Sequence, residues 1–154
     1  MDLLYVGFKG SYNNSFRLVN EMAGNHLFLT NSFAGLRNDI SHMKRIYDNV
    51  LMFGVDKKLN GEIRIETRAE RNGNCKYSTV DVKALSDQLE CCGIHNKISN
   101  NPTSYLCNDA YYEMLTKCAN SQVVFIHIPS KRGMTEVFFN KLLIFFQDKR
   151  QMGI

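Results

Sequence analysis

Short apolar runs alternate with amphipathic, helix-like segments along the whole chain, and this alternation constrains the fold more than any other feature. Runs such as LLYVGF at 3–8 and VLMFGV at 50–55 have the length and the apolar composition of buried strands. Other segments place apolar residues at helical spacing, as in NSFRLVNEMAG at 14–24. Strands that alternate with helices predict an α/β domain, with a mostly parallel central sheet flanked by helices in three layers.

The same patterns set the expected boundaries of the elements. We expect strands at residues 3–8, 26–31, 50–55, 61–70, 97–100 and 122–128. We expect helices at residues 14–24, 34–49, 79–94, 104–118 and 135–150, and a polar loop at residues 72–79. With 154 residues and no visible repeat or linker, the chain is predicted to form a single domain over residues 1–154.

Composition excludes several classes of protein. The net charge of +4 is mild and the basic residues are scattered, so neither a nucleic-acid partner nor a membrane surface is expected. The opening MDLLYVGFKG does not resemble a secretory leader, and the apolar runs are shorter than the roughly 20 residues of a spanning helix. The five cysteines therefore predict free thiols in a reducing cytoplasm. Without a C-x-x-C pair, no zinc or other metal site is expected.

Cys107 is the first candidate for chemistry, because it follows the polar run SNNPTS and stands at the beginning of the predicted helix 104–118. A thiol near the positive end of a helix dipole ionises more readily, and nearby backbone N–H groups can hold an oxyanion. The alternative is a small buried core thiol, as most free cysteines are. The polar approach favours an exposed, functional thiol.

His127 is the second candidate, since it lies near the end of the apolar strand VVFIHIP, which Pro129 terminates. A histidine there needs a polar partner, so a satisfied core histidine is the alternative. Ligands of α/β sheets bind at the carboxyl ends of strands. We therefore expect Cys107 and His127 to meet at one edge of the sheet as a thiol nucleophile and its base.

Four segments, in order, resemble one known family. ISNNPTSYLCN is similar to the pyroglutamyl-peptidase pattern S-N-x-A-G-x-Y-x-C-N around the nucleophilic cysteine, and FIHIP resembles that family's F-x-H-x-P around its catalytic histidine. LLYVGFKGSYNNS is similar to the opening strand and loop G-F-x-P-F-G-G…N-P-S. VLMFGV…GEIRIETRAERN resembles A-L-G-x-A-G-G-R…I-x-x-E-R-x-A-x-N. The resemblance covers nearly the whole chain and agrees with the α/β prediction.

This resemblance implies a cysteine peptidase that removes an amino-terminal pyroglutamyl residue from peptides without a metal or cofactor. Cys107 matches the nucleophile, His127 the base and Glu66 the carboxylate that orients the base. The strand period alone would leave Glu66 in solvent beside Glu62 and Glu70. The implied partner is a peptide with a blocked amino terminus, and a homo-oligomer is compatible with the resemblance.

The resemblance also implies three substrate-binding residues. Phe8 matches a phenylalanine of the opening loop that lines the lactam pocket, and Tyr12 takes the place of a second one. Lys76 stands ten residues past Glu66, where the family has an arginine near the site.

The chain departs from the family pattern in ways that leave alternatives open. The family is usually longer, GVDKKLNGE replaces a glycine-rich turn, and Thr67 stands where an arginine follows the glutamate. Pro102, before the nucleophile, removes a backbone donor. A homologue with an altered substrate, or a non-cleaving binding protein, is one alternative. A thiol redox protein that pairs Cys107 with Cys91 or Cys92 is another.

Overall fold

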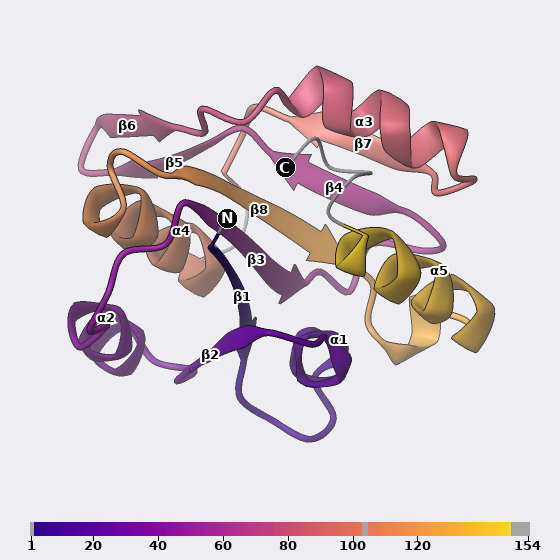
Figure 1. The fold of residues 1–154 in the computed structure, drawn as a ribbon, viewed down its shortest axis with the longest axis horizontal. Helices are drawn as coiled ribbons and strands as arrows, with labels where there is room; N and C mark the ends of the chain where they lie inside the picture. Colours follow the sequence, from indigo (N-terminus) through magenta and orange to yellow (C-terminus); the bar gives the residue numbers. More distant parts are fainter. Residues whose placement is uncertain (1, 103–104, 149–154) are drawn as a thin grey trace.

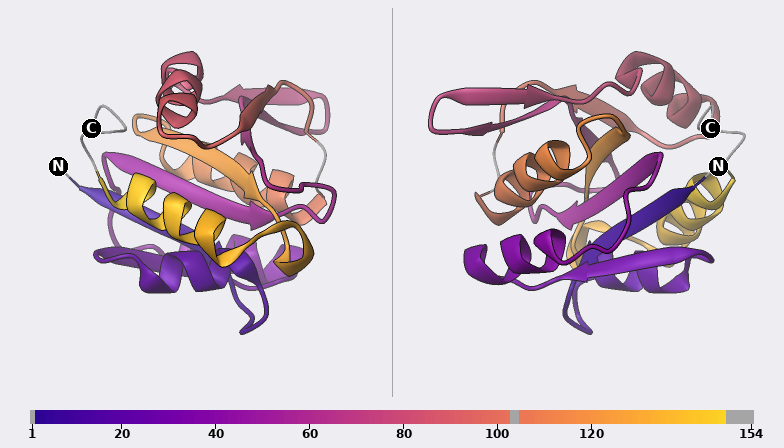
Figure 2. Two further views of the ribbon diagram at one scale, coloured as in Figure 1. Left: turned by 90° about the vertical axis from the view of Figure 1, so that its right-hand side faces the viewer. Right: turned by 60° about the vertical axis from the view of Figure 1, so that its left-hand side comes forward.

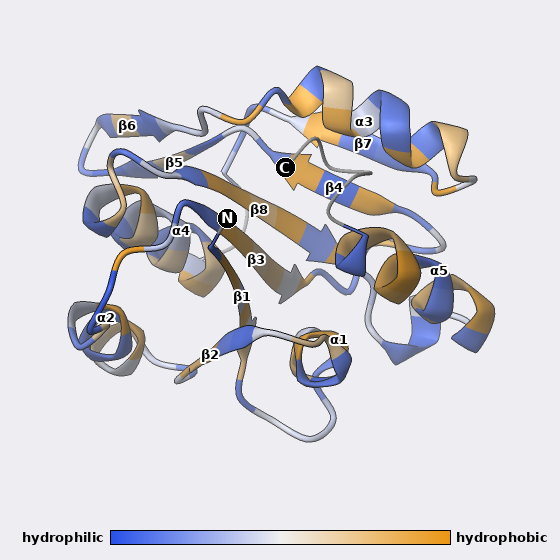
Figure 3. Cartoon of the chain, in the orientation of Figure 1, coloured by the Kyte–Doolittle hydropathy of each residue, from blue (hydrophilic) through white to orange (hydrophobic). Residues whose placement is uncertain are grey.

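The computed structural model describes residues 2–102 and 105–148, and its centre is a six-stranded sheet (Figure 1). The strands of this sheet are β1 (Leu3–Phe8), β2 (Asn25–Leu29), β3 (Asn49–Val55), β4 (Ile63–Glu66), β7 (Asn96–Ser99) and β8 (Gln122–Ile128). They lie in the order β2-β1-β3-β8-β4-β7, and apolar residues concentrate on the central strands (Figure 3). The predicted α/β class is confirmed.

Helices cover both faces of the sheet (Figure 2). The helices are α1 (Asn14–Glu21), α2 (Phe33–Ser41), α3 (Val82–Cys91), α4 (Tyr105–Lys117), the short 3₁₀ turn η1 (Lys131–Gly133) and α5 (Glu136–Gln147). Apolar residues of α1, α3 and α5 form one core cluster with one face of the strands, and those of α2 and α4 form a second cluster with the other face. Within the described ranges, no helix is both long enough and apolar enough to cross a membrane.

Strand direction divides the sheet. β1, β2, β3 and β8 run parallel, whereas β4 pairs antiparallel with β8 and β7 pairs parallel with β4. The carboxyl ends of β7 and β8 therefore lie at opposite edges. The expectation that Cys107 and His127 meet because their strands end at one edge is wrong, and Cys107 approaches β8 over a face of the sheet instead.

The predicted single strand at 61–70 is in fact two strands. β4 belongs to the large sheet, whereas β5 (Arg68–Arg71) forms a separate antiparallel hairpin with β6 (Asn74–Tyr77). The hairpin turns at Asn72 and Gly73, which both have positive φ, as an Asn-Gly turn requires. The loop predicted at 72–79 therefore contains a strand that the turn sequence itself signals.

The helix predicted at 34–49 ends much earlier, at Ser41. His42 caps it, because its backbone N–H and its Nδ1 both lie within hydrogen-bonding distance of the carbonyl of Asn38. Met43 and Tyr47 still pack against the cluster of α2 and α4, although they lie outside the helix. These residues are apolar because the irregular segment packs against the core, and their spacing happened to match that of a helix. Residues 104, 149 and 150 of the predicted helices lie outside the described residues.

An ion-pair network fastens α4 to its neighbours. Asp109 of α4 accepts from Arg37 of α2 at 2.9 Å and from Arg71 of β5 at 2.5 Å, and Arg71 also reaches Glu113 at 2.6 Å. The Asp109 side chain is only 8% exposed. Burial alone would raise its pKa, but the two arginines hold the pKa of Asp109 below its ordinary value. The network therefore fixes the helix that carries Cys107.

We expect Asp109→Asn to lower the free energy of unfolding by about 2 kcal/mol near pH 7, because it leaves two arginines without their buried acceptor. The stabilisation by Asp109 is present above the unfolded pKa of about 4 and is lost as pH falls through the lower folded pKa. Urea unfolding at pH 7 and in stronger acid should show the difference between the two proteins shrinking. Asp87→Asn, in the exposed pair with Lys83, is the control and should change little.

Candidate functional site

A small cavity of about 190 Å³ opens on the sheet face that α4 covers. Its lining includes a thiol, an imidazole and a carboxylate from distant parts of the chain, namely Cys107, His127 and Glu66. The remaining lining residues are Arg68, Pro102, Asn108, Tyr111 and Phe125.

Cys107 lies in the first turn of α4, over the face of the sheet, and is only 8% exposed, so the expectation of an exposed thiol is wrong. A Cβ atom on Gly54 of β3 would stand 2.6 Å from the Cys107 sulfur and 2.7 Å from the Phe125 ring. The absence of a side chain at Gly54 therefore lets the thiol approach the strand. Gly54 is also the register partner of His127 across β3 and β8, so the thiol lies over the strand pair that carries the imidazole.

His127 is buried, and Glu66 fixes its ring. The Nδ1 atom lies 2.9 Å from Oε1 of Glu66, and the two side chains are 3% and 5% exposed. The same Oε1 accepts a hydrogen bond from Arg64, so this oxygen acts as an acceptor and Nδ1 of His127 must donate to it. In the neutral ring the lone pair is then on Nε2, which has no hydrogen-bond partner among the described residues.

Arg64 continues this chain of charges. Its Nε donates to Oε1 of Glu66 at 2.7 Å and its Nη2 donates to Asp56 at 2.9 Å. Although burial opposes it, the bonds to Glu66 and Asp56 raise the pKa of Arg64 above its ordinary value. Burial would raise the pKa of Asp56 too, but the Lys58 amide and Arg64 hold it below its ordinary value. Arg64 and Asp56 are therefore both charged near neutral pH.

Two residues of α4 hold the remaining wall in place. The hydroxyl of Tyr111 donates to the backbone carbonyl of Glu66 at 3.0 Å, and burial raises the pKa of this phenol, so it stays neutral. Asn108 pairs with both backbone groups of Glu70 in β5, at 2.8 and 3.0 Å. These hydrogen bonds connect α4, which carries Cys107, to β4 and β5.

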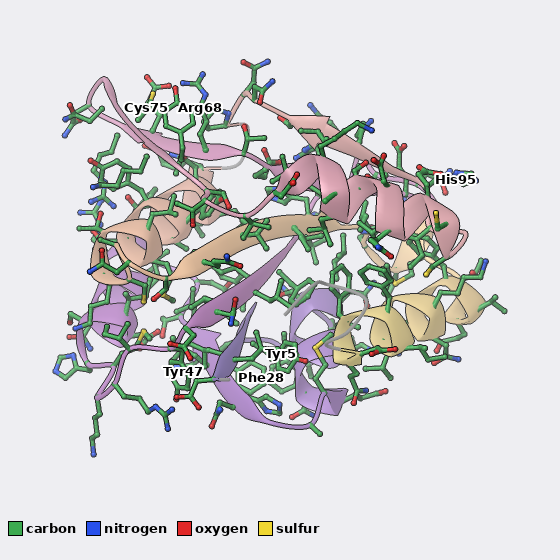
Figure 4. All side chains as sticks on the ribbon, turned by 45° about the horizontal axis from the view of Figure 1, so that its top comes forward. Tyr5, Phe28, Tyr47, Arg68, Cys75 and His95 are labelled. Atoms are coloured by element: carbon green, nitrogen blue, oxygen red, sulfur yellow. The ribbon has the colours of Figure 1, made fainter. Side chains whose placement is uncertain are left out.

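Arg68 adds a cation to the cavity wall from β5. Its Nε donates to the carbonyl of Asn100 at 2.5 Å, and its Nη1 lies 2.9 Å from the sulfur of Cys75. Figure 4 shows Arg68 and Cys75 side by side on the β5–β6 hairpin. The family resemblance implied that Lys76 supplies a cation at the site, whereas Arg68 is the cation that lines the cavity.

The three predicted substrate-binding residues lie elsewhere. Phe8 is 3% exposed and packs in the core against α2, because it is the last inward residue of β1. Tyr12 is 83% exposed and its ring lies under the ammonium of Lys131. Lys76 points from β6 toward the ring of Tyr112. None of the three lines the cavity.

Glu66 differs from its strand neighbours in a way that the period of two could not reveal. Glu62 pairs with Lys97 at 2.9 Å and Glu70 is exposed, whereas Glu66 is 4% exposed. Sequence reasoning also missed Arg64, which shares the strand face of Glu66. The alternation of Ile63 and Ile65 with Arg64 and Glu66 placed these two charges together, but gave no sign that they would be buried.

Among residues 2–102 and 105–148, no group of three His, Cys, Asp or Glu side chains is arranged to hold a metal ion. Nδ1 of His127 is instead paired with Glu66, whereas Nε2 of His127 and Oε2 of Glu66 have no hydrogen-bond partner among the described residues. The arrangement can therefore hold a nucleophile beside a base whose tautomer is fixed.

Comparisons with known proteins add three findings. The family model for pyroglutamyl peptidase matches residues 15–136. The pyrrolidone-carboxylate peptidase of Fusobacterium nucleatum is 33% identical over 101 residues, and that of Brevibacillus brevis is 34% identical over 101 residues. Each alignment covers 62% of this chain and 46% of the relative, so the chain matches just under half the length of these proteins.

Solved structures share the fold at lower identity. The pyrrolidone carboxyl peptidase of Thermus thermophilus aligns with a TM-score of 0.76 and 20% identity, over 94% of this chain and 98% of that one. The enzyme from Fervidobacterium islandicum aligns with a TM-score of 0.74 and 18% identity, over 97% and 98%. The A199P mutant from P. furiosus gives a TM-score of 0.78 and 17% identity, over 99% of each chain.

We expect Gly54→Ala to displace the Cys107 sulfur and the Phe125 ring, because the added methyl group would overlap both. The free energy of unfolding should fall by roughly 1 to 3 kcal/mol. Alkylation of Cys107 by iodoacetamide, followed by mass spectrometry, should change in rate in the folded protein. Gly7→Ala is a matched control. Its methyl group would lie 2.7 Å from the Ser15 carbonyl oxygen, and Gly7 does not line the cavity. Equal alkylation rates in the two variants would contradict the assigned contact.

Proposed function

We propose, from the premise that this chain belongs to the pyroglutamyl peptidase family, that it is a cysteine peptidase that removes an amino-terminal pyroglutamyl group from peptides. Cys107 is the nucleophile, His127 the general base and Glu66 the group that orients the base. One observation carries the proposal: a thiol lines the same small cavity as an imidazole whose Nδ1 is bonded to a buried carboxylate and whose Nε2 is unpaired among the described residues.

The reaction begins with proton transfer. Nε2 of His127 takes the thiol proton as the Cys107 sulfur bonds to the acyl carbon of the pyroglutamyl group. The carbonyl electron pair moves to oxygen, and the first turn of α4 offers the positive end of its dipole there. Glu66 stabilises the imidazolium that forms, through the 2.9 Å bond to Nδ1.

The intermediate then collapses. The bond from carbon to the peptide nitrogen breaks, and the imidazolium returns its proton to the leaving amine. The pyroglutamyl group remains as a thioester on Cys107, until water, activated by the same imidazole, releases it and restores the thiol. These two steps, acylation and hydrolysis, require only Cys107, His127, Glu66 and water.

The lining of the cavity supports an uncharged acyl group as the substrate. Phe125 and Tyr111 supply apolar surface, while Arg68 offers donors to a carbonyl oxygen. Phe8 and Tyr12 do not shape this wall, so specificity would rest on α4 and the β5 strand rather than on the opening loop. These differences favour, as a second candidate, an acyl group related to pyroglutamyl as the substrate.

The arrangement of the cysteines disfavours a thiol redox protein. Cys92 packs with the cluster of α1, α3 and α5, whereas Cys107 belongs to the cluster on the opposite face of the sheet. Cys91 is exposed on the same α3 helix. Neither cysteine of α3 can reach Cys107 without unfolding part of the sheet, because disulfide bonding requires Cα atoms within about 7 Å.

The decisive experiment follows release of a fluorescent amine from a pyroglutamyl-amide substrate. We expect turnover by the wild type, its loss in Cys107→Ser and its retention in Cys91→Ser, since Cys91 lies outside the cavity. No turnover together with rapid alkylation of Cys107 near neutral pH would point to another acyl substrate. No turnover together with a sluggish thiol would overturn the peptidase proposal and favour a binding protein.

We expect Glu66→Gln to lower kcat by roughly 10²- to 10⁴-fold, because the amide cannot stabilise an imidazolium and can impose the wrong tautomer. KM should change far less, since Glu66 need not contact the leaving peptide. Steady-state kinetics on the same substrate provide the check, with circular dichroism as the control for folding. A kcat within a few-fold of the wild type would remove Glu66 from the mechanism.

A further inference from the structure

A nucleophile, a base and an orienting carboxylate need no further ion pair, yet two more charges stand beside them. Arg64 is the direct register partner of His127 across β4 and β8. Asp56 follows Gly54, the partner of His127 on the other side, by two residues. Arg64 joins the two sides, because it donates to Glu66 at 2.7 Å and to Asp56 at 2.9 Å. Its side chain is 11% exposed and that of Asp56 is 17% exposed.

The two charges act on a proton at His127 with opposite signs. Arg64 shares Oε1 of Glu66 with His127, so its positive charge draws on the carboxylate that would otherwise stabilise the imidazolium. Asp56 returns a negative charge from the far side of Arg64. The charges of Asp56, Arg64 and Glu66 sum to −1, whereas Arg64 and Glu66 alone sum to zero. An imidazolium in this weakly solvated place depends on that difference.

We infer that Arg64 and Asp56 are positioning residues that set, with opposite signs, how readily His127 holds the proton of the thiol. The inference rests on the proposed function for its role in turnover. Arg64 also fixes the rotamer of Glu66, because a guanidinium bonded to two carboxylates has one geometry that satisfies both. Arg64 and Asp56 are not among the residues that line the cavity, so we infer that they act through Glu66 and the field at His127.

Other groups also face His127. Cys107 and the neutral Tyr111 face it from α4, Glu66 from β4 and Arg68 from β5. Among these, Glu66 loses a hydrogen bond when Arg64 is replaced. The guanidinium of Arg68 is bonded to Asn100 and Cys75, so changes at Arg64 or Asp56 leave those two bonds of Arg68 in place.

The test is the NMR titration of the imidazole C–H resonances, with His127 assigned by the signal lost in His127→Asn. We expect Asp56→Asn to lower the pKa of His127 by roughly half a unit to one unit, and Arg64→Gln to raise it by about one unit. The double variant should return close to the wild type, because it removes one charge of each sign. The acid limb of Cys107 alkylation against pH should move in the same directions.

Purely structural roles predict a different outcome. Shifts in one direction for both single variants, or no shift in either, would overturn the inference. If Arg64→Gln does not fold, Asp56→Asn and the double variant decide: an unchanged or raised pKa of His127 in Asp56→Asn overturns it. Lys83→Gln and Asp87→Asn, in an exposed pair on α3, are matched controls for net charge and should leave His127 unmoved.

The titration needs no substrate, so the two proposals fail separately. Opposite shifts without pyroglutamyl-amide turnover would support the charge pair and overturn the peptidase. Turnover in the wild type without opposite shifts would support the peptidase and overturn the role of Arg64 and Asp56. Arg64→Lys is expected to keep the wild-type pKa of His127 while lowering kcat, since the charge stays and the two-sided geometry is lost.

Discussion

The buried carboxylate of Glu66 is the constraint on which the rest of the site depends. A charge that is 5% exposed must be paired, and Glu66 is paired through one oxygen with both Arg64 and His127. That sharing fixes the tautomer of the imidazole, directs Nε2 away from the carboxylate and holds a cation inside the sheet. Loss of Glu66 would leave Arg64 and His127, which are register partners, without the acceptor that they share.

This pairing exists because one strand runs backwards. If β4 ran parallel to β8, other residues of β4 would lie opposite His127 and Phe125. The antiparallel register instead places Arg64 opposite His127 and Glu66, two residues further along β4, opposite Phe125. The parallel strand β3 then supplies Gly54 on the other side, whose missing side chain admits the thiol of α4. The three chemical groups meet over a sheet face rather than beyond strand ends.

The shape of the family fold is retained with few identical residues. TM-scores of 0.74 and 0.76 accompany identities of 18% and 20%. Much of that shape comes from two apolar clusters, one on each face, which many combinations of residues can fill. In the cavity the cation is Arg68, Asp56 and Arg64 are paired behind Glu66, and Phe8 lies in the core.

The sequence by itself predicted the α/β class and most strands and helices, because periodicity is a local property, and its motif order predicted Cys107, His127 and Glu66 as site residues through a family resemblance. The Asn-Gly turn at 72–73 was also present in the sequence, although the loop interpretation overlooked it. Only the tertiary structure decided the direction of β4, the early end of α2 and the burial of Glu66 and Arg64. Those outcomes depend on which strands pair and which faces are covered, and these are contacts between residues far apart in the sequence, such as Glu66 and His127, which are 61 positions apart. A period of two places a charge on a face, but only the packing of α4 on that face removes it from water.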